Sequence, residues 1–318
     1  MTKLRAVLVL TFSLWWGQAL LANPVVQPLV DALTLSQLVD LPQVKVVDIR
    51  AKEDYEKGHV PHALSAPYAL WRGPANNPGQ LIEKDTLQQR IRQLGLSAQD
   101  HVIVYAEGDS QTDFGAAARV YWTFKYAGLT QLSVLNGGYQ QWQKQKLPIS
   151  KDPVSAEPSD FVVQINDAIV ISQQELLEKI QQPNASSQWL DARPESFFQG
   201  QTKAPTASVP GTIAGAKSVP HQQWFNTDSA TLKPIEVIQK QVQQSGLAQA
   251  QDTVSFCNTG HWAATNWFVL SEIAQLPNVK LYPASLAEWT QSVQALPMEH
   301  TPSRLGQIRL KFQQLFNN

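Results

Sequence analysis

One sequence unit occurs twice in this chain of 318 residues, and this repeat constrains the fold more than any other feature. The matched segments are VVDIR at residues 46–50 with WLDAR at 189–193, GHVPHA at 58–63 with GTIAGA at 211–216, and Trp142 with Trp289. The offset between the copies changes from 143 to 153 and then to 147 residues, which indicates an insertion near residues 200–210. A repeat of this length predicts two domains of one fold.

Each copy alternates short apolar segments with segments of helical periodicity. The apolar segments, which we interpret as strands, cover residues 45–49, 101–106 and 133–135, then 188–192, 253–256 and 279–281. The helical segments cover residues 86–94, 114–126, 234–245 and 263–274. Strands that alternate with helices predict an α/β fold, so we expect two tandem domains, each a mainly parallel sheet flanked by helices.

The polar, proline-containing stretch at residues 151–160 is typical of a linker. It separates a predicted first domain at residues 24–150 from a second at residues 161–298. Apolar positions recur in the tail at residues 299–318, so we expect a helix that packs on a domain, with a partner-binding role as the alternative.

Residues 1–22 have the pattern of a signal peptide. Lys3 and Arg5 precede an apolar stretch that ends at Leu21, and the small Ala22 follows, so cleavage after Ala22 is expected. Retention as a membrane anchor is the alternative, although the stretch is short and polar for a spanning helix. We therefore expect export, to the periplasm, with no membrane association after cleavage.

Charge and composition exclude some partners. The formal net charge is −1, which provides no basic surface for nucleic acid. Histidine and cysteine show no clustered spacing of metal ligands. We expect neither a nucleic acid partner nor a metal.

The single cysteine, Cys257, stands at the most informative point of the sequence. A lone cysteine in an exported protein is either buried and inert or a reactive thiol. A predicted strand ends just before it, and a helix is expected from Ala263 after a five-residue loop of Asn258, Thr259, Gly260, His261 and Trp262. Such a loop offers free N–H groups that form an anion cradle and favour a thiolate or a persulfide anion. We interpret Cys257 as the catalytic residue and the loop as its cradle, in which Gly260 lets the backbone turn.

These motifs resemble the rhodanese superfamily, specifically the tandem-domain thiosulfate and 3-mercaptopyruvate sulfurtransferases. The resemblance covers nearly all of the chain after residue 22. It is carried by VDIR at residues 47–50, GHVPHA at 58–63, LNGGY at 135–139, LDAR at 190–193, and Cys257 with its loop. In that family the second domain holds the active cysteine and the first has lost it. Here the residue that matches Cys257 is Ala106, or Tyr105 if the alignment slips by one, and neither can carry sulfur.

The resemblance implies two rhodanese-like domains that face each other, with the Cys257 loop near their interface. It also implies a ping-pong sulfurtransferase. A donor, thiosulfate or mercaptopyruvate, would pass sulfur to Cys257 to give a persulfide, and cyanide, a thiol or a protein acceptor would remove it. Attack by a thiolate through a covalent intermediate needs no metal or organic cofactor.

Three side chains near the cysteine are candidates for binding the donor. Arg193 ends a predicted strand and would bind an anion by charge-assisted hydrogen bonds, unless it is tied to Asp191. His261 would add positive charge if protonated, would still hydrogen-bond donor oxygens if neutral, or would face solvent. Trp262 either shapes the mouth of a pocket or packs on the following helix. For Arg50, the counterpart of Arg193, we expect a structural role.

Two departures from the family pattern concern the donor. The loop is neither rich in basic residues, as in the thiosulfate type, nor small and glycine-rich, as in the mercaptopyruvate type. Where the family often has a second arginine after the LDAR segment, this chain has Phe197 and Phe198, which offer nothing to a carboxylate. We therefore favour thiosulfate, a compact dianion, with mercaptopyruvate as the alternative.

Three other functions fit the pattern less well. A phosphatase on the same fold needs a loop one residue longer that ends in arginine, and residue 263 is alanine. A non-catalytic sulfur carrier or redox module would use the same thiol with a protein partner. A purely structural binding protein would not require the single cysteine at this strand end.

Overall fold

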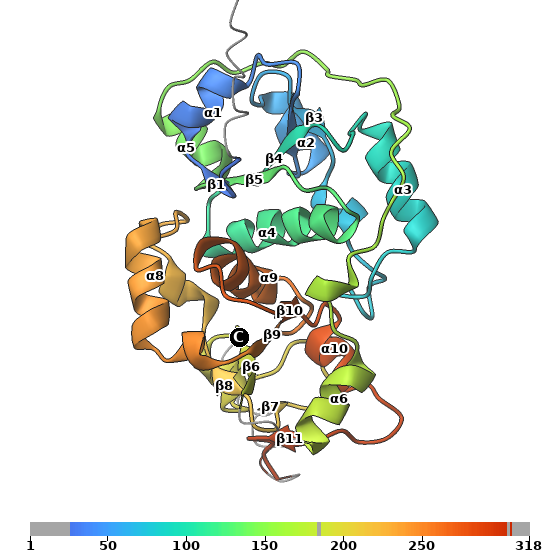
Figure 1. Cartoon of the computed structure of the whole chain (residues 1–318), viewed down its shortest axis with the longest axis vertical. Helices are drawn as coiled ribbons and strands as arrows, with labels where there is room; N and C mark the ends of the chain where they lie inside the picture. Colours follow the sequence, from blue (N-terminus) through green and yellow to red (C-terminus); the bar gives the residue numbers. More distant parts are fainter. Residues whose placement is uncertain (1–25, 183–185, 304–305, 307–318) are drawn as a thin grey trace, which may run out of the picture.

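The computed structural model describes residues 26–182, 186–303 and 306, and it contains two α/β units, one above the other in Figure 1. The predicted signal peptide and most of the predicted C-terminal helix lie outside the described residues. In the part of the chain that the structure describes, no helix is long and apolar enough to cross a membrane.

The first unit is a parallel sheet covered by helices on both faces. Its strands run in the order β1 (Leu29–Val30), β5 (Leu132–Leu135), β4 (His101–Tyr105), β2 (Val44–Asp48) and β3 (Leu64–Ser65). One face packs against α1 (Ala32–Leu38), α2 (Lys52–Lys57) and α5 (Gly138–Lys144), and the other against α3 (Lys84–Gln93) and α4 (Gln111–Tyr126). Because both faces are covered, the central strands are almost wholly buried, which explains their continuous apolar sequence.

The second unit repeats this design. Its parallel strands run in the order β10 (Val279–Leu281), β9 (Asp252–Phe256), β6 (Ser187–Asp191) and β8 (Lys217–Ser218). One face packs against α6 (Gln173–Gln181) and α10 (Ser285–Trp289), and the other against α8 (Ile235–Gln244) and α9 (Trp262–Phe268); the short α7 (Glu195–Phe198) follows β6. The shared order β5-β4-β2-β3 and β10-β9-β6-β8 confirms the expected α/β fold with two flanked parallel sheets.

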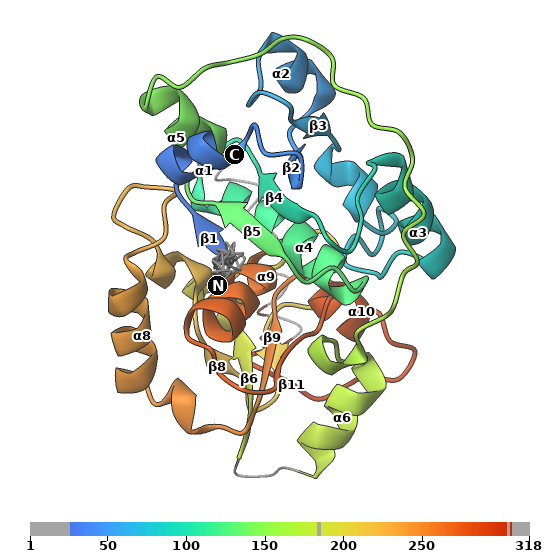
Figure 2. The same ribbon diagram turned by 45° about the horizontal axis from the view of Figure 1, so that its top comes forward.

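The two units meet through α4 and α9, which lie side by side between the two sheets in Figures 1 and 2. The ring of Phe114 on α4 meets the ring of Phe268 on α9 edge-on, with centroids 5.5 Å apart. Beyond α9, the π-helical turn Val269–Ile273 presents Glu272, which pairs with Lys125 at 2.7 Å and accepts a hydrogen bond from Tyr121 at 2.6 Å. Since α9 begins directly after the Cys257 loop, this contact places the loop at the interface, as expected.

The described start of the C-terminal tail forms a strand, and the helix expected within residues 299–318 falls mostly outside the described residues and stays a prediction. Met298–Glu299 forms the strand β11, which pairs antiparallel with β7 (Thr212–Ile213), and residues 300–303 have no helical structure. The tail therefore begins as an added strand and not as a helix. The backbone groups of the short strand β7 gain a partner in this way.

Candidate active site

Cys257 lies at the carboxyl end of β9, the strand between β10 and β6, where ligands bind in open α/β sheets. The residue is 1% exposed. Its carbonyl accepts the N–H of Leu286 at 3.1 Å, and the next carbonyl, that of Asn258, accepts the N–H of Ala287 at 2.9 Å. The thiol therefore sits on a backbone that α10 holds in place.

Ser285 also holds this backbone, and we did not predict its role from the sequence. Its hydroxyl accepts the N–H of Cys257 at 3.1 Å and donates to the carbonyl of Tyr282 at 2.8 Å. Its φ is 54°, in the left-handed region that most side chains avoid. The counterpart in the first unit is Gly138, with φ of 60°. The offset between Trp142 and Trp289 also matches Gly138 to Ser285, so the repeat could have drawn attention to the serine.

The same comparison shows which residue has replaced the cysteine. In the first unit the carbonyl of Ala106 accepts the N–H of Tyr139 at 2.9 Å, just as the carbonyl of Cys257 accepts the N–H of Leu286. Ala106 directly follows β4, and Cys257 directly follows the equivalent strand β9. Ala106 is therefore the counterpart, and the alternative alignment with Tyr105 is wrong.

The loop after Cys257 has a row of unused donors. Within the described residues, none of the backbone N–H groups from Asn258 to Ala263 donates a hydrogen bond. Buried N–H groups without a partner are rare in native structures, because leaving them unpaired costs free energy. Gly260, with φ of 69°, supports the turn that brings these groups together. This is the arrangement that a bound anion stabilises.

Arg193 lies next to this loop, but its hydrogen bonds are made within the protein. Its Nε and Nη2 donate to the carboxylate of Asp191, with a shortest distance of 2.6 Å, and Nη2 also donates to the carbonyl of Gly211 at 2.7 Å. Its Nη1 donates to Oδ1 of Asn258 at 3.3 Å, and the side chain is 1% exposed. Arg193 is therefore paired with Asp191, which we had expected as the alternative to anion binding. Anion binding by Arg193 stays a prediction, and the observed contacts orient Asn258 instead.

His261 reaches across the interface into the first unit. Its Nε2 donates to the carbonyl of Thr112 at 2.7 Å, and its Nδ1 accepts from the hydroxyl of Tyr68 at 2.9 Å. Burial, together with the positive charge of Arg72, lowers the pKa of His261 to about 3. The lowered pKa supports the neutral alternative for the imidazole near neutral pH. Both ring nitrogens are already used, so the side chain joins the loop to the first unit.

Trp262 lines a cavity of about 430 Å³ between the units. Its ring stacks on His221, with centroids 4.9 Å apart, and meets Phe197 edge-on at 6.0 Å. Residues of the first unit, Asp109 among them, form the opposite wall. His221 is a second residue that we did not predict: its Nδ1 donates to the carbonyl of Ala192 at 3.0 Å, and burial lowers its pKa to about 4. It therefore contributes a neutral imidazole to the cavity wall.

Two arginines of the first unit, Arg72 and Arg119, also contact the loop, and the sequence analysis missed both. Arg72 donates to the carbonyl of Thr259 at 3.0 Å, and Arg119 donates to the carbonyl of Gly260 at 3.3 Å. One sequence signal pointed to Arg119, because it is a charged residue inside the otherwise apolar segment 114–124. An arginine at a buried helix position needs a reason to be there.

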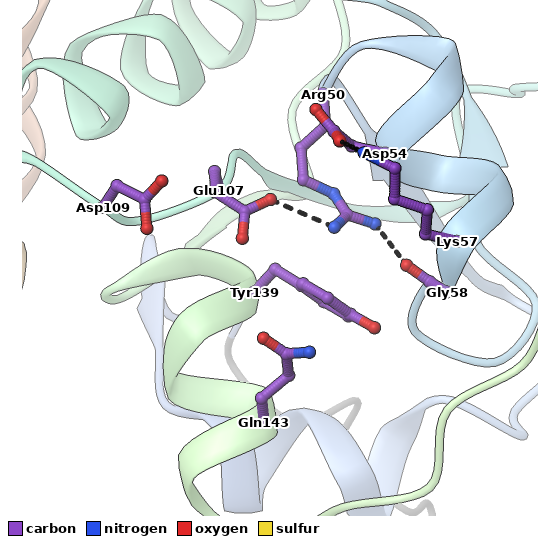
Figure 3. A pocket seen from close by; sticks show the side chains of 8 residues that line it. All are labelled: Arg50, Asp54, Lys57, Gly58, Glu107, Asp109, Tyr139 and Gln143. Carbon is purple, nitrogen blue, oxygen red and sulfur yellow. Dashed lines mark hydrogen bonds and ion pairs between the residues drawn. The ribbon is translucent and has the colours of Figure 1, made fainter.

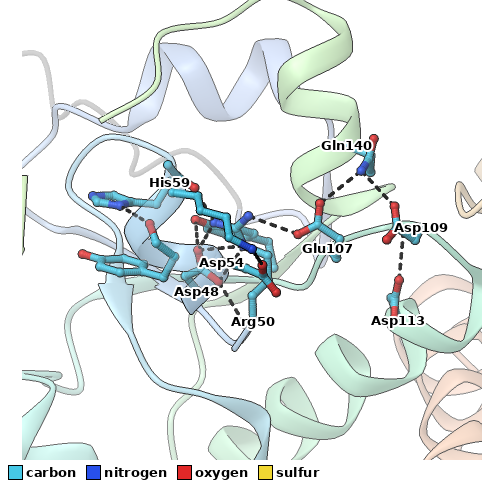
Figure 4. A network of polar contacts seen from close by, with 12 residues as sticks. Asp48, Arg50, Asp54, His59, Glu107, Asp109, Asp113 and Gln140 are labelled. Carbon is cyan, nitrogen blue, oxygen red and sulfur yellow. Dashed lines mark hydrogen bonds and ion pairs between the residues drawn. The ribbon is translucent and has the colours of Figure 1, made fainter. Parts of the chain in front are cut away.

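The equivalent place in the first unit keeps the architecture without the thiol. Arg50 pairs with Asp48 at 2.7 Å and with Glu107 at 3.1 Å, and its guanidinium lies 3.8 Å from the centre of the Tyr139 ring. Figure 3 shows Arg50, Glu107 and Tyr139 around a cavity of about 310 Å³, and Figure 4 shows that Gln140 bridges the carboxylates of Glu107 and Asp109. The charge of Arg50 is paired with Asp48 and Glu107, which supports a structural role for this arginine.

The fold and the site together define a class. A model of the rhodanese-like domain matches residues 31–145 and 172–292, so the chain belongs to the rhodanese family and contains that domain twice. The chain is accordingly a sulfurtransferase of this family, with the thiol in the second copy.

Curated relatives and solved structures agree with this placement. A putative thiosulfate sulfurtransferase of Mycobacterium tuberculosis is 30% identical over 80% of this chain and 92% of its own length. The 3-mercaptopyruvate sulfurtransferase of Escherichia coli is 26% identical over the same shares, and the crystal structure of that kind of enzyme from Escherichia coli matches 82% of this chain and 100% of its own with a TM-score of 0.70 at 25% identity. The structure of EanB in complex with ergothioneine matches 87% of this chain and 71% of its own with a TM-score of 0.75 at 21% identity, which shows the fold alone.

Proposed function

We propose that the protein moves sulfane sulfur from thiosulfate to a small thiophilic acceptor through a persulfide on Cys257. The observation that carries this proposal is the single thiol at the end of β9, followed by a loop whose N–H groups from Asn258 to Ala263 have no partner among the described residues. A persulfide anion would accept those hydrogen bonds.

The reaction has two balanced steps. The Cys257 thiolate attacks the outer sulfur of thiosulfate, a new S–S bond forms, and the old S–S bond breaks so that sulfite leaves with the electron pair. An acceptor then attacks the outer sulfur of the persulfide. Cyanide would leave as thiocyanate, a thiolate would leave as a persulfide, and the Cys257 thiolate is regenerated.

The burial of the site supports a small acceptor over a protein acceptor. Cys257 is 1% exposed, so a protein acceptor would have to bring its thiol to a buried side chain. Cyanide and small thiols need less room to reach it. A non-catalytic carrier role with a protein partner is less well supported for this reason.

3-Mercaptopyruvate is the second candidate donor, because relatives with both names match the chain at similar identity. Against it, Phe197 packs on Trp262 and Phe198 is 8% exposed, so neither position provides a cation for a carboxylate. Thiosulfate needs fewer contacts spread along the ligand.

The test is intact mass measurement after incubation with thiosulfate or with mercaptopyruvate, followed by steady-state kinetics with cyanide. We expect one added sulfur atom on the wild type and none on Cys257→Ser, and a higher kcat/KM for thiosulfate. A wild-type protein that gains no sulfur from either donor would overturn the proposal. A clearly higher kcat/KM for mercaptopyruvate would overturn the donor assignment alone.

We also propose that the protein is exported and cleaved after Ala22, on the sequence pattern of residues 1–22. The N-terminal sequence of protein recovered from a periplasmic fraction tests this directly. Material that starts at Asn23 supports it, and material that keeps residue 1 or stays with the cytoplasm contradicts it.

A further inference from the structure

Arg119 is a buried cation without a carboxylate partner. It lies on α4, is 1% exposed, and takes part in no ion pair with the described residues. Its hydrogen bonds go only to backbone carbonyls, those of Gly79 at 2.9 Å, Gly260 at 3.3 Å and Pro283 at 3.4 Å. The guanidinium also lies 5.1 Å from the centre of the Trp122 ring, a contact that supplies no counter-charge. Its Nε has no hydrogen-bond partner there. By contrast, the buried arginines Arg50 and Arg193 each pair with an aspartate.

A buried charge without a counter-ion costs several kcal/mol, so its presence requires an explanation. The acidic groups that act on Arg119 are Tyr68 and Cys257: burial and Arg72 lower the pKa of Arg119 to about 9, whereas Tyr68 and Cys257 raise it. Burial raises the pKa of Tyr68, so that hydroxyl stays neutral. The Cys257 thiolate, or its persulfide, is the anion that remains.

The two first-unit arginines also orient the loop. Arg72 binds the carbonyl of Thr259 at 3.0 Å, and Arg119 binds the next carbonyl, that of Gly260. In a trans peptide the C=O and the following N–H point in opposite directions. The N–H groups of Gly260 and His261 therefore point away from the arginines, and both belong to the unused donors of the cradle.

Gly260 makes this contact possible. A Cβ at that position would lie 2.2 Å from Nη1 of Arg119 and 2.2 Å from the carbonyl oxygen of Pro283. A side chain there would push the guanidinium out of the loop. The glycine thus serves the approach of the arginine as well as the turn.

We propose that Arg119, from the unit without a thiol, is the counter-charge of the Cys257 anion, and that Arg119 and Arg72 together hold the loop carbonyls so that its N–H groups serve the cradle. This inference rests on the proposed function only in naming the persulfide; for the thiolate it stands by itself. Arg119 is a positioning residue, because it acts on the cysteine through its charge and through the loop.

Several charged or titratable groups face this site from both units and bear on its pH dependence. They are Tyr68, Arg72 and Arg119 from the first unit, and Asp191, Arg193, His221 and His261 from the second. The two histidines are neutral near neutral pH and the Asp191–Arg193 pair is internally compensated. The pH response of the thiol should therefore depend chiefly on the two first-unit arginines.

The experiment measures the rate of Cys257 alkylation by iodoacetamide against pH, in the full chain, with thermal unfolding as the check of folding. We expect Arg119→Gln to move the midpoint of the profile upward by about one pH unit, which lowers the rate below the midpoint about tenfold. Arg119→Lys, which keeps the charge, should stay closer to the wild type than Arg119→Gln does. The matched control is Arg92→Gln, since Arg92 also binds carbonyls, those of Asp160 and Phe161, but does so away from the loop.

A folded Arg119→Gln with an unchanged midpoint would overturn the inference. If that variant does not fold, Arg119→Lys decides: a midpoint near the wild type supports the role of the charge, and a shift of a full unit contradicts it. Alkylation needs no sulfur donor, so its outcome is independent of sulfur transfer. A midpoint that responds to Arg119 in a protein that accepts no sulfur would refute the proposed function and leave this inference intact.

Discussion

Replacing Ser285 by alanine and by glycine separates the stabilisation by its hydroxyl hydrogen bonds from the cost of its unfavourable backbone φ. The backbone at Ser285 has φ of 54°, which costs a residue with a side chain about 1 kcal/mol. The hydroxyl meets the N–H of Cys257 at 3.1 Å and the carbonyl of Tyr282 at 2.8 Å, and the residue is fully buried.

The magnitudes follow from these contacts. Alanine keeps the unfavourable φ and leaves a buried N–H and a buried carbonyl with one partner fewer, which costs about 2 kcal/mol of unfolding free energy. Glycine loses the same hydrogen bonds but removes the backbone strain, and the net gain relative to alanine is about 1 kcal/mol. We therefore expect Ser285→Gly to be more stable than Ser285→Ala and less stable than the wild type.

Urea unfolding of the three proteins measures these differences. Ser133 provides the matched control, because it is also fully buried and hydrogen-bonded but lies inside β5 with an extended backbone. At Ser133 the order should reverse, since glycine weakens a strand interior. If Ser285→Gly were no more stable than Ser285→Ala, the assignment of backbone strain to this position would be wrong.

Three further predictions concern the thiol, the buried His221 and the half-buried His261. Cys257→Ser should abolish sulfur transfer and change the urea midpoint little, because serine is nearly isosteric but cannot carry sulfane sulfur; normal transfer by this variant would refute the persulfide route. His261→Ala should lower kcat/KM by the same factor at pH 6 and at pH 8, since the neutral ring acts only by joining the loop to Tyr68 and Thr112; a loss confined to pH 6 would show that the ring is cationic after all. Folding lowers the pKa of His221 to about 4 and that of His261 to about 3, so below about pH 6.5 the unfolded chain binds more protons than the folded one. The free energy of unfolding should therefore fall as the pH drops from 6.5 towards 4, by about 1.4 kcal/mol per pH unit for each histidine. If the pH dependence of the unfolding free energy were the same in His221→Gln as in the wild type, this prediction would be wrong.

Local patterns in the sequence were sufficient to predict the fold and the place of the thiol. A strand, a cysteine, a short loop and a helix follow one another without interruption, so chain connectivity alone places Cys257 at the sheet edge. The repeat predicted the second sheet from the first in the same way. The exact counterpart of the cysteine was left open, because Ala106 and Tyr105 are neighbours and only the hydrogen bond from Tyr139 decides between them.

The wall of the site could not be predicted in this way. Tyr68, Arg72 and Arg119 precede the loop by 141 to 193 residues, and no spacing rule connects one unit to the other. The protonation of His261 depends on the same packing, because the ring loses its charge only when the first unit buries it. For Arg193, by contrast, the partner is only two residues away. The sequence therefore allowed us to consider a pairing with Asp191, and the structure contains it.

The duplication explains why the unit without a thiol is retained at the site. Both units keep the same Asp–Arg pair at the carboxyl edge of the sheet, Asp48–Arg50 and Asp191–Arg193, so both keep the backbone geometry of that edge. In the first unit, this edge of the sheet carries the paired charges of Asp48 and Arg50. Helix α4 of the same unit places the buried Arg119 against the Cys257 loop of the second unit. The second unit supplies the thiol and the N–H groups, and the first supplies two arginines that contact the loop. Charge acts more strongly in a buried site than in water, so under the proposed role of Arg119 the interface between the units, rather than the surface of either, is the place where the first unit can act on the thiol.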